Sequence, residues 1–194
     1  MNVRAFFNSE FEEHHDVARR TQAALEGVFV SLLNACVASL RNGGKLMFFG
    51  NGGSAADAQH LATELTIRYK TNRSAIAALA LTTDTSALTA AGNDLGFERL
   101  FSRQIEALGK KGDVAIAIST SGKSSNILAA MRQARSMGIV TASLSGKGGG
   151  DIAPLTDHLL IVPSDATARI QEMHITLGQM LCAAIEIELG LVDP

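Results

Sequence analysis

Apolar residues recur at helical spacing from about residue 6 to residue 41, and the triplet NGG at 42–44 ends the pattern. Because residues three and four apart share one face of a helix, this spacing predicts amphipathic helices over residues 1–42, with Gly27 as a possible break between them. The positions on the apolar faces are Val17, Leu25, Phe29, Leu32, Leu33, Val37 and Leu40.

After this segment, five short apolar runs alternate with helical patterns. The runs are KLMFFG at 45–50, IAALAL at 76–81, DVAIAIS at 113–119, IVTASLS at 139–145 and HLLIVP at 158–163. The helical patterns cover 54–69, 85–91, 100–108, 125–137 and 166–189. Strands that alternate with helices form parallel sheets covered on both faces. The pattern predicts an α/β fold with a five-stranded parallel sheet flanked by helices, a long C-terminal helix, and one domain over 1–194 with its α/β core at 45–194.

Composition agrees with a globular domain. The chain has 194 residues, of which 46% are hydrophobic and 19% charged, and this length suits one domain with a substantial core. The formal net charge of −2 gives no basic field for nucleic acid or an anionic membrane, so an anionic ligand would be held by local geometry. We therefore expect neither a nucleic-acid nor a membrane partner.

The compartment is predicted from the cysteines and the N-terminus. Both cysteines, Cys36 and Cys182, lie in helical patterns, which favours a reducing environment over a disulfide framework. The N-terminus MNVRAFFNSEFEEHHD carries acidic and histidine residues where a signal peptide needs a continuous apolar region. We also expect no apolar run of membrane-spanning length. These features predict a cytoplasmic protein.

The stretch after the first apolar run has the chemistry of an anion site. Gly50, Gly52 and Gly53 allow positive φ and close approach of the backbone to a ligand, and Ser54 adds a hydroxyl donor at the start of a helix. The first N–H groups of that helix and the positive end of its dipole favour a negative group such as phosphate. One face of the same helix carries His60 and Glu64, four residues apart.

A second turn of this kind follows the third apolar run. It carries the hydroxyl groups of Ser119, Thr120, Ser121 and Ser124 and opens another helix. In an open parallel sheet the loops after the first and third strands meet where the strand order reverses, which is where ligands bind. A third glycine-rich stretch, SGKGGGD at 145–151, could line the rim, but we favour a simple turn for it.

Taken together, four motifs resemble one family. GNGGSAADAQH at 50–60, GND at 92–94, STSGKS at 119–124 and ARIQEMH at 168–174 are similar to the SIS (sugar isomerase) domain, and within it to phosphoheptose isomerases. The resemblance implies a homotetramer with active sites at subunit interfaces and the N-terminal segment used in packing. It also implies conversion of sedoheptulose 7-phosphate to D-glycero-D-manno-heptose 7-phosphate, which feeds heptose synthesis for lipopolysaccharide.

The resemblance also assigns roles to residues. Glu64 corresponds to the catalytic glutamate, which takes a proton from the carbon next to the carbonyl and contacts both substrate and zinc. The implied zinc ligands are His60, Glu64, Gln171 and the residue at 179. The implied substrate contacts are Asn51, Gly52, Gly53, Ser54, Glu64, Asn93, Asp94, Ser119, Thr120, Ser121, Ser124 and Gln171.

One position departs from the family pattern. Eight residues after Gln171, where the family has a histidine that serves as second acid/base and metal ligand, this chain has Gln179. An amide does not titrate near neutrality, so Gln179 cannot shuttle a proton as an imidazole does. Either activity is impaired, or Gln179 polarises the carbonyl and coordinates metal weakly while Glu64 alone moves the proton. The sequence does not separate a natural glutamine from an engineered, inactivating one.

Other interpretations remain open at this level. The chain could be a non-catalytic SIS protein that binds phosphosugar or associates with a replication initiator, although relatives of that class lack the glutamate that Glu64 provides. His60 and Glu64 could be an ordinary surface pair. Asp94 could be a helix cap, and we expect His174, one turn after Gln171, to serve no acid/base role.

Overall fold

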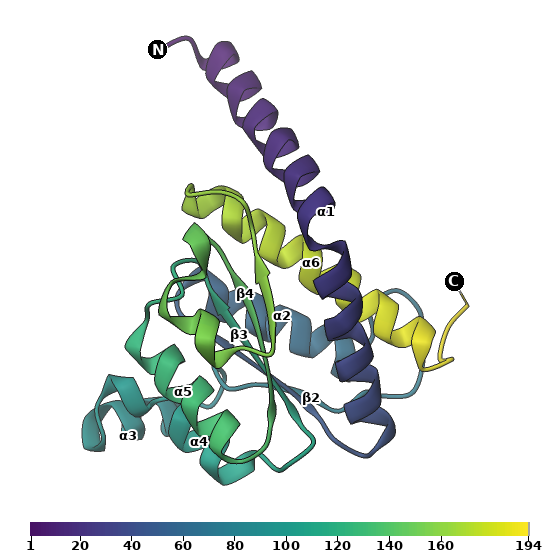
Figure 1. Cartoon of the computed structure of the whole chain (residues 1–194), viewed down its shortest axis with the longest axis vertical. Helices are drawn as coiled ribbons and strands as arrows, with labels where there is room; N and C mark the ends of the chain where they lie inside the picture. The colour runs from purple at the N-terminus through teal and green to yellow at the C-terminus, as the bar shows by residue number, and fades with distance from the viewer. Residues whose placement is uncertain (194) are drawn as a thin grey trace.

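The computed structural model describes residues 1–193 as a parallel α/β sandwich (Figure 1). Its strands are β1 (Leu46–Gly50), β2 (Ala78–Ala80), β3 (Val114–Ser119), β4 (Val140–Ser145) and β5 (His158–Ile161). The strand order is β2-β1-β3-β4-β5, with every neighbouring pair parallel. The predicted five-stranded parallel sheet is confirmed, and the reversal of strand order falls between β1 and β3, where ligand sites form in open sheets.

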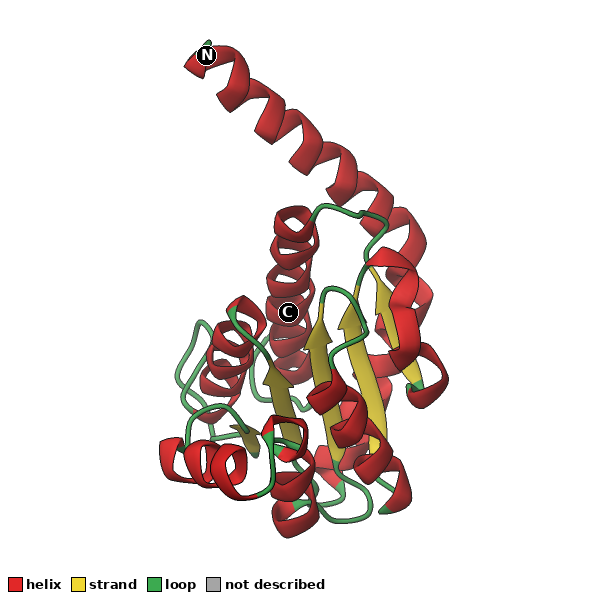
Figure 2. Ribbon diagram, turned by 90° about the vertical axis from the view of Figure 1, so that its left-hand side faces the viewer, coloured by secondary structure: helices red, strands yellow, loops and turns green. Residues whose placement is uncertain are grey.

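Helices cover both faces of the sheet (Figure 2). The elements are α1 (Val3–Arg41), α2 (Gly53–Thr66), α3 (Thr85–Asp94), η1 (Phe97–Arg99), α4 (Ser102–Leu108), α5 (Ser125–Ser136), η2 (Lys147–Leu155) and α6 (Thr167–Glu188). One apolar core lies between the sheet and α1, α2 and α6, and the other lies between the sheet and α4 and α5. The central strands β1 and β3 are buried throughout, because both of their faces are covered.

The N-terminal segment differs from the prediction in one respect. It forms a single helix of 39 residues, so the predicted break at Gly27 is wrong. A Cβ at Gly27 would meet nothing within 4 Å, and an isolated glycine weakens a helix without ending it. Asn42 and Gly43 then terminate α1 as expected, with Gly43 at φ 73°.

The expectation about apolar runs is also wrong. Within residues 1–193, one helix, α1, is long enough and apolar enough to cross a membrane by length and composition. Of its most apolar 18-residue window, 28% is buried. Core helices of soluble proteins pass the same test, so the finding is weak evidence for a membrane. The C-terminal half of α1 contributes Leu25, Leu32, Cys36 and Val37 to the core, whereas its first turns project from the body (Figure 1).

Candidate active site

The turn after β1 agrees with the prediction in part: of Gly50, Gly52 and Gly53, only Gly52 has a positive φ. Gly52 has φ 57° and precedes α2, whose N-terminus receives no side-chain cap from residues 1–193. Inside the turn, the Ser54 N–H donates to the Asn51 carbonyl at 3.0 Å, and the Ser54 side chain is buried. The helix therefore begins inside the loop, with the positive end of its dipole at the carboxyl edge of the sheet.

Gln171 of α6 reaches this turn. A Cβ placed on Gly53 would lie only 2.7 Å from Gln171 Nε2. No larger residue fits at position 53 without displacing the glutamine side chain. The structure therefore brings Gln171 and Gly53 together, as the resemblance implies.

About two helical turns further along α2, three predicted residues meet. His60 Nε2 lies 2.8 Å from Glu64 Oε1, and Gln179 Nε2 of α6 lies 3.5 Å from the same imidazole nitrogen. The Glu64 side chain is 18% exposed and that of His60 46%. The carboxylate is thus sheltered but accessible, as a proton-transfer group must be.

Close packing of α2 against α6 makes this meeting possible. A Cβ on Gly178 would lie 2.5 Å from Leu61 Cδ1, so only glycine lets the two helices approach this closely. Gln179 is the next residue of α6, and its amide nitrogen reaches His60. Between Gly53 and Glu64, α2 and α6 together line a strip of polar groups: the Gln171 amide, the imidazole, the carboxylate and the Gln179 amide.

The second predicted loop follows β3. The Gly122 N–H donates to Ser119 Oγ at 3.2 Å, the Lys123 N–H donates to Ser121 Oγ at 3.3 Å, and Gly122 has φ 61°. Ser124 precedes α5 without capping it by its side chain. Hydroxyl groups and the N-terminus of α5 thus gather at one turn, which suits a phosphate group.

The third glycine-rich stretch supports this loop, so it does more than turn the chain. Residues 147–150 all have positive φ, and the Ile152 N–H donates to the Gly122 carbonyl at 3.0 Å. A Cβ at Gly122 would overlap the Gly149 carbonyl oxygen. The glycines of η2 therefore let its backbone press directly on the loop after β3.

The two loops are joined by a residue that the sequence reasoning missed. The Asn51 and Asn126 side-chain amides bond each other reciprocally, at 2.9 and 2.8 Å. This contact confirms the prediction that the loops after the first and third strands meet. The only sign of Asn126 in the sequence is a single asparagine near the start of α5, which could equally have faced solvent.

Comparison with known proteins agrees with this geometry. The model of the SIS domain family matches residues 11–146. The chain belongs to the SIS domain family. It is 58% identical over 186 residues to a phosphoheptose isomerase of Paramagnetospirillum magneticum, covering 96% of this chain and 97% of that protein. It is 54% identical over 177 residues to a phosphoheptose isomerase of Campylobacter jejuni, covering 91% and 95%.

Solved structures give the same picture. This SIS domain superposes on a phosphoheptose isomerase of Neisseria gonorrhoeae with a TM-score of 0.90 and 42% identity, covering 96% of this chain and 100% of that one. A phosphoheptose isomerase of Francisella tularensis gives a TM-score of 0.93 at 36% identity, with the same coverage. The chain is thus an SIS-domain protein whose near relatives are aldose–ketose isomerases.

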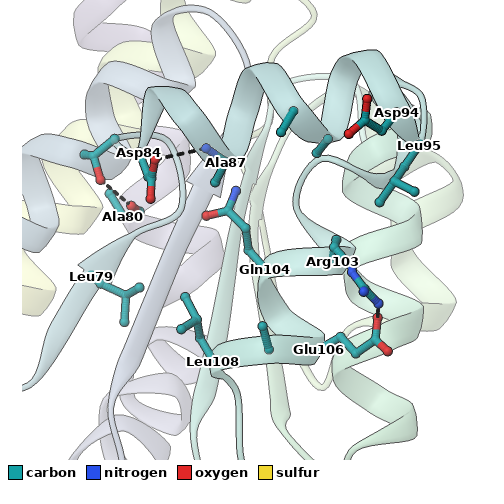
Figure 3. Close-up of a pocket in the computed structure, with 14 residues that line it drawn as sticks. Leu79, Ala80, Asp84, Ala87, Asp94, Leu95, Arg103, Gln104, Glu106 and Leu108 are labelled. Carbon is teal, nitrogen blue, oxygen red and sulfur yellow. Dashed lines mark hydrogen bonds and ion pairs between the residues drawn. The ribbon is translucent and has the colours of Figure 1, made fainter.

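Asn93 and Asp94 form a pair of their own, separate from His60, Glu64 and Gln179. Asn93 Nδ2 donates to Asp94 Oδ1 at 2.7 Å, and within residues 1–193 neither side chain bonds to the His60, Glu64 or Gln179 side chains. Asp94 ends α3 and lines a groove of about 870 Å³ between α3 and α4 (Figure 3). The N-cap of α3 is Asp84, so Asp94 is no N-cap. The single chain does not bring this pair to Glu64.

Arg73 is a second residue that the sequence reasoning missed. Its guanidinium donates to the Glu64 carbonyl at 2.7 Å and to Glu186 Oε1 at 2.7 Å, and both side chains of this ion pair are nearly fully buried. Arg73 thereby ties the last turn of α2 to α6. The backbone of Glu64 is held from behind while its carboxylate faces His60.

His174 serves the packing of the SIS domain. It is fully buried and its Nε2 lies 3.0 Å from the Ser145 carbonyl oxygen. Burial lowers the pKa of His174 to about 4, although the bond to Ser145 opposes the shift. The imidazole is therefore neutral near pH 7 and donates its N–H to the end of β4.

The donors near Glu64 limit what metal this SIS domain can hold. No group of three or more His, Cys, Asp or Glu side chains among residues 1–193 is placed to bind a metal ion. The imidazole of His60 and the carboxylate of Glu64 are ordinary zinc donors, and the Gln179 and Gln171 amides could supply weaker oxygen donors. His60 and Glu64 are therefore the two ordinary donors that could hold such an ion, whereas the Gln171 amide lies at Gly53, at the other end of α2.

Proposed function

We propose that the protein is an aldose–ketose isomerase that converts sedoheptulose 7-phosphate to D-glycero-D-manno-heptose 7-phosphate. The observation that carries the proposal is the sheltered Glu64 carboxylate, paired with His60 on the helix that opens at the first anion loop. The similarity to phosphoheptose isomerases over nearly the whole chain supports the same substrate.

The binding step uses the two loops. The phosphate lies in the loop of Ser119, Thr120, Ser121 and Ser124 at the N-terminus of α5, where hydroxyl and amide donors replace its water shell. The carbonyl end of the sugar extends toward the Asn51–Ser54 turn, where Gln171 contacts Gly53. A ligand anchored in this way presents its first two carbons to α2.

The chemical step is a proton transfer between two carbons. The Glu64 carboxylate removes a proton from C1 of the ketose, which leaves an enediolate with its charge on O2. The O1 hydroxyl proton passes to O2, and Glu64 returns its proton to C2, which gives the aldehyde at C1. A positioned base of this kind contributes about 10² to 10⁴ in rate.

Gln179 and His60 assist the proton transfer: Gln179 stabilises the charge that develops on the substrate oxygen, and His60 orients the base. The Gln179 amide donates a hydrogen bond to the substrate oxygen instead of shuttling a proton, because a carboxamide does not titrate in this range. His60 orients Glu64 through their 2.8 Å contact. A zinc ion held by His60, Glu64, Gln171 and Gln179 would act as a Lewis acid on the carbonyl.

The assembly and compartment form part of the proposal. Phe6, Phe7 and Phe11 are each at least half exposed on the projecting part of α1, and large apolar side chains in such a cluster are typical of an interface. We assign them to a homotetramer in which sites lie between subunits and Asn93 and Asp94 serve a neighbour's site. The protein would act in the cytoplasm in heptose synthesis for lipopolysaccharide.

Turnover tests the proposal directly. Purified protein supplied with zinc and sedoheptulose 7-phosphate is expected to form the heptose 7-phosphate, detected by chromatography of the sugar phosphates. Absence of turnover, together with retention of a replication initiator protein in a pulldown, would support the non-catalytic alternative. That alternative is consistent with a glutamine at position 179, where the family has a histidine.

A further inference from the structure

Asn126 is the second residue of α5 and belongs to the turn that follows β3. Its side chain is 1% exposed and lies opposite Asn51, the first residue after β1. Asn51 Nδ2 donates to Asn126 Oδ1 at 2.9 Å, and Asn126 Nδ2 donates to Asn51 Oδ1 at 2.8 Å. Asn126 Oδ1 also accepts the Ile127 N–H at 2.9 Å, which fixes which end of this amide is oxygen.

The two amides match each other in this pair. Each side chain donates through Nδ2 and accepts through Oδ1, which an ionised carboxylate, having no donor, or an alkyl group cannot do. A buried amide that loses its partner also keeps the cost of its lost hydration. Asparagine at both positions therefore lets each amide satisfy the other.

The position of the pair gives it a mechanical role. β1 and β3 are in register up to Gly50 and Ile118, where β1 ends, and β3 continues for one more residue, Ser119, before its loop begins. The amide pair continues the connection beyond the last ladder bond. The far side of the second loop is held separately by the Ile152 N–H on the Gly122 carbonyl.

We propose that Asn126 is a positioning residue that acts through Asn51. It sets the spacing between the loop after β3 that holds the phosphate (residues 119–124, the phosphate loop) and the turn at the start of α2. Under the proposed function, on which this inference rests, that spacing decides whether a sugar held by its phosphate places its first two carbons at Glu64. The Asn51 side chain then serves the loop spacing, because its amide oxygen is occupied by Asn126.

The experiment compares Asn126→Ala, Asn51→Ala and the double variant with Thr141→Val. Thr141 is a matched control because its buried hydroxyl donates to Asp157 Oδ2 at 2.9 Å and accepts the Asp157 N–H at 3.1 Å, at the opposite, amino end of the sheet. Inorganic phosphate binding is measured by calorimetry, and kcat and KM are measured with sedoheptulose 7-phosphate.

Each asparagine variant is expected to bind inorganic phosphate within about two-fold of wild type, because the phosphate loop keeps its support from η2. The kcat is expected to fall about 10- to 100-fold, since a misplacement of about 1 Å has such an effect on an oriented reaction. The double variant should lose no more than the single ones, because the two amides act as one unit. Thr141→Val should keep kcat.

Three results would overturn the inference. One is a parallel loss of phosphate binding and kcat, which would mean that Asn126 only folds the phosphate loop. Another is normal kcat in Asn51→Ala beside a low kcat in Asn126→Ala. The third does not depend on turnover: hydrogen exchange at residues 51–54 that is no faster in Asn126→Ala than in Thr141→Val. Inactive wild-type protein would instead reject the proposed function, and the exchange measurement would still decide the role of Asn126.

Discussion

Gln179 of α6 lies against His60 of α2, with 3.5 Å between the amide nitrogen and the imidazole Nε2. An amide therefore stands next to the imidazole that also contacts the proposed base, Glu64. The close approach of Gly178 to Leu61 fixes this arrangement in the backbone. Position 179 thus lies beside His60 whichever residue occupies it.

Replacing the proposed base is the first test of the mechanism. Glu64→Gln keeps the shape of the side chain but cannot accept a proton, so kcat should fall by about 10² to 10⁴. Inorganic phosphate binding should persist, because the phosphate loop lies after β3. Glu188→Gln, at an exposed position near the end of α6, is the control and should match wild type. Retention of more than a tenth of the activity in Glu64→Gln would exclude Glu64 as the base.

Restoring an imidazole at position 179 tests the metal site. Gln179→His would place two imidazoles and a carboxylate together, a stronger zinc donor set than the present one. We expect a higher zinc content in untreated protein, measured by elemental analysis, and a higher kcat. Gln179→Asn serves as the control that keeps an amide. Equal zinc content and equal rates in wild type and Gln179→His would show that position 179 affects neither.

Gly122, which is tightly enclosed, tests how the phosphate loop is supported, and Gly27, which is in open space, is its control. Gly122→Ala adds a methyl group against the Gly149 carbonyl at a residue with φ 61°, so we expect lower stability and a raised KM. Gly27→Ala adds the same methyl group in open space on α1 and should stabilise the protein by about 0.5–1 kcal/mol. Urea unfolding and steady-state kinetics measure both effects. An unchanged KM in Gly122→Ala would show that contact between η2 and the loop does not matter for binding.

The lowered pKa of His174 leads us to expect that the stability of the fold depends on pH. Its pKa in the folded chain is lowered from 6.5 to about 4 by burial. Between these values the unfolded chain binds a proton that the folded chain does not, so the free energy of unfolding decreases as pH falls through this window, by up to about 3 kcal/mol. The contribution is fully present above pH 6.5. His174→Gln can still donate to Ser145 but does not titrate, so its urea midpoint should fall less between pH 6.5 and 4. An identical fall in both proteins would mean that other groups cause the acid sensitivity.

The local pattern of the sequence determined most of the fold. Alternating apolar runs and helical patterns predicted the five parallel strands and the helices between them, because burial on both faces leaves a continuous apolar signature. The glycine and hydroxyl positions predicted a turn followed by a helix after β1 and after β3, because positive φ at Gly52 and Gly122 and the start of a helix are local properties. The unbroken α1 could not be predicted, since the effect of one glycine in a long helix depends on packing.

Tertiary structure decided which residues act together. Only the family resemblance groups Gln179 with His60, 119 residues away; the local pattern does not, and the contact exists because Gly178 lets α6 approach Leu61. Asn126, Arg73 and the η2 glycines are likewise defined by partners far along the chain. Periodicity records which side of an element is buried, but it holds no record of what lies opposite, and that opposing surface gives these residues their roles.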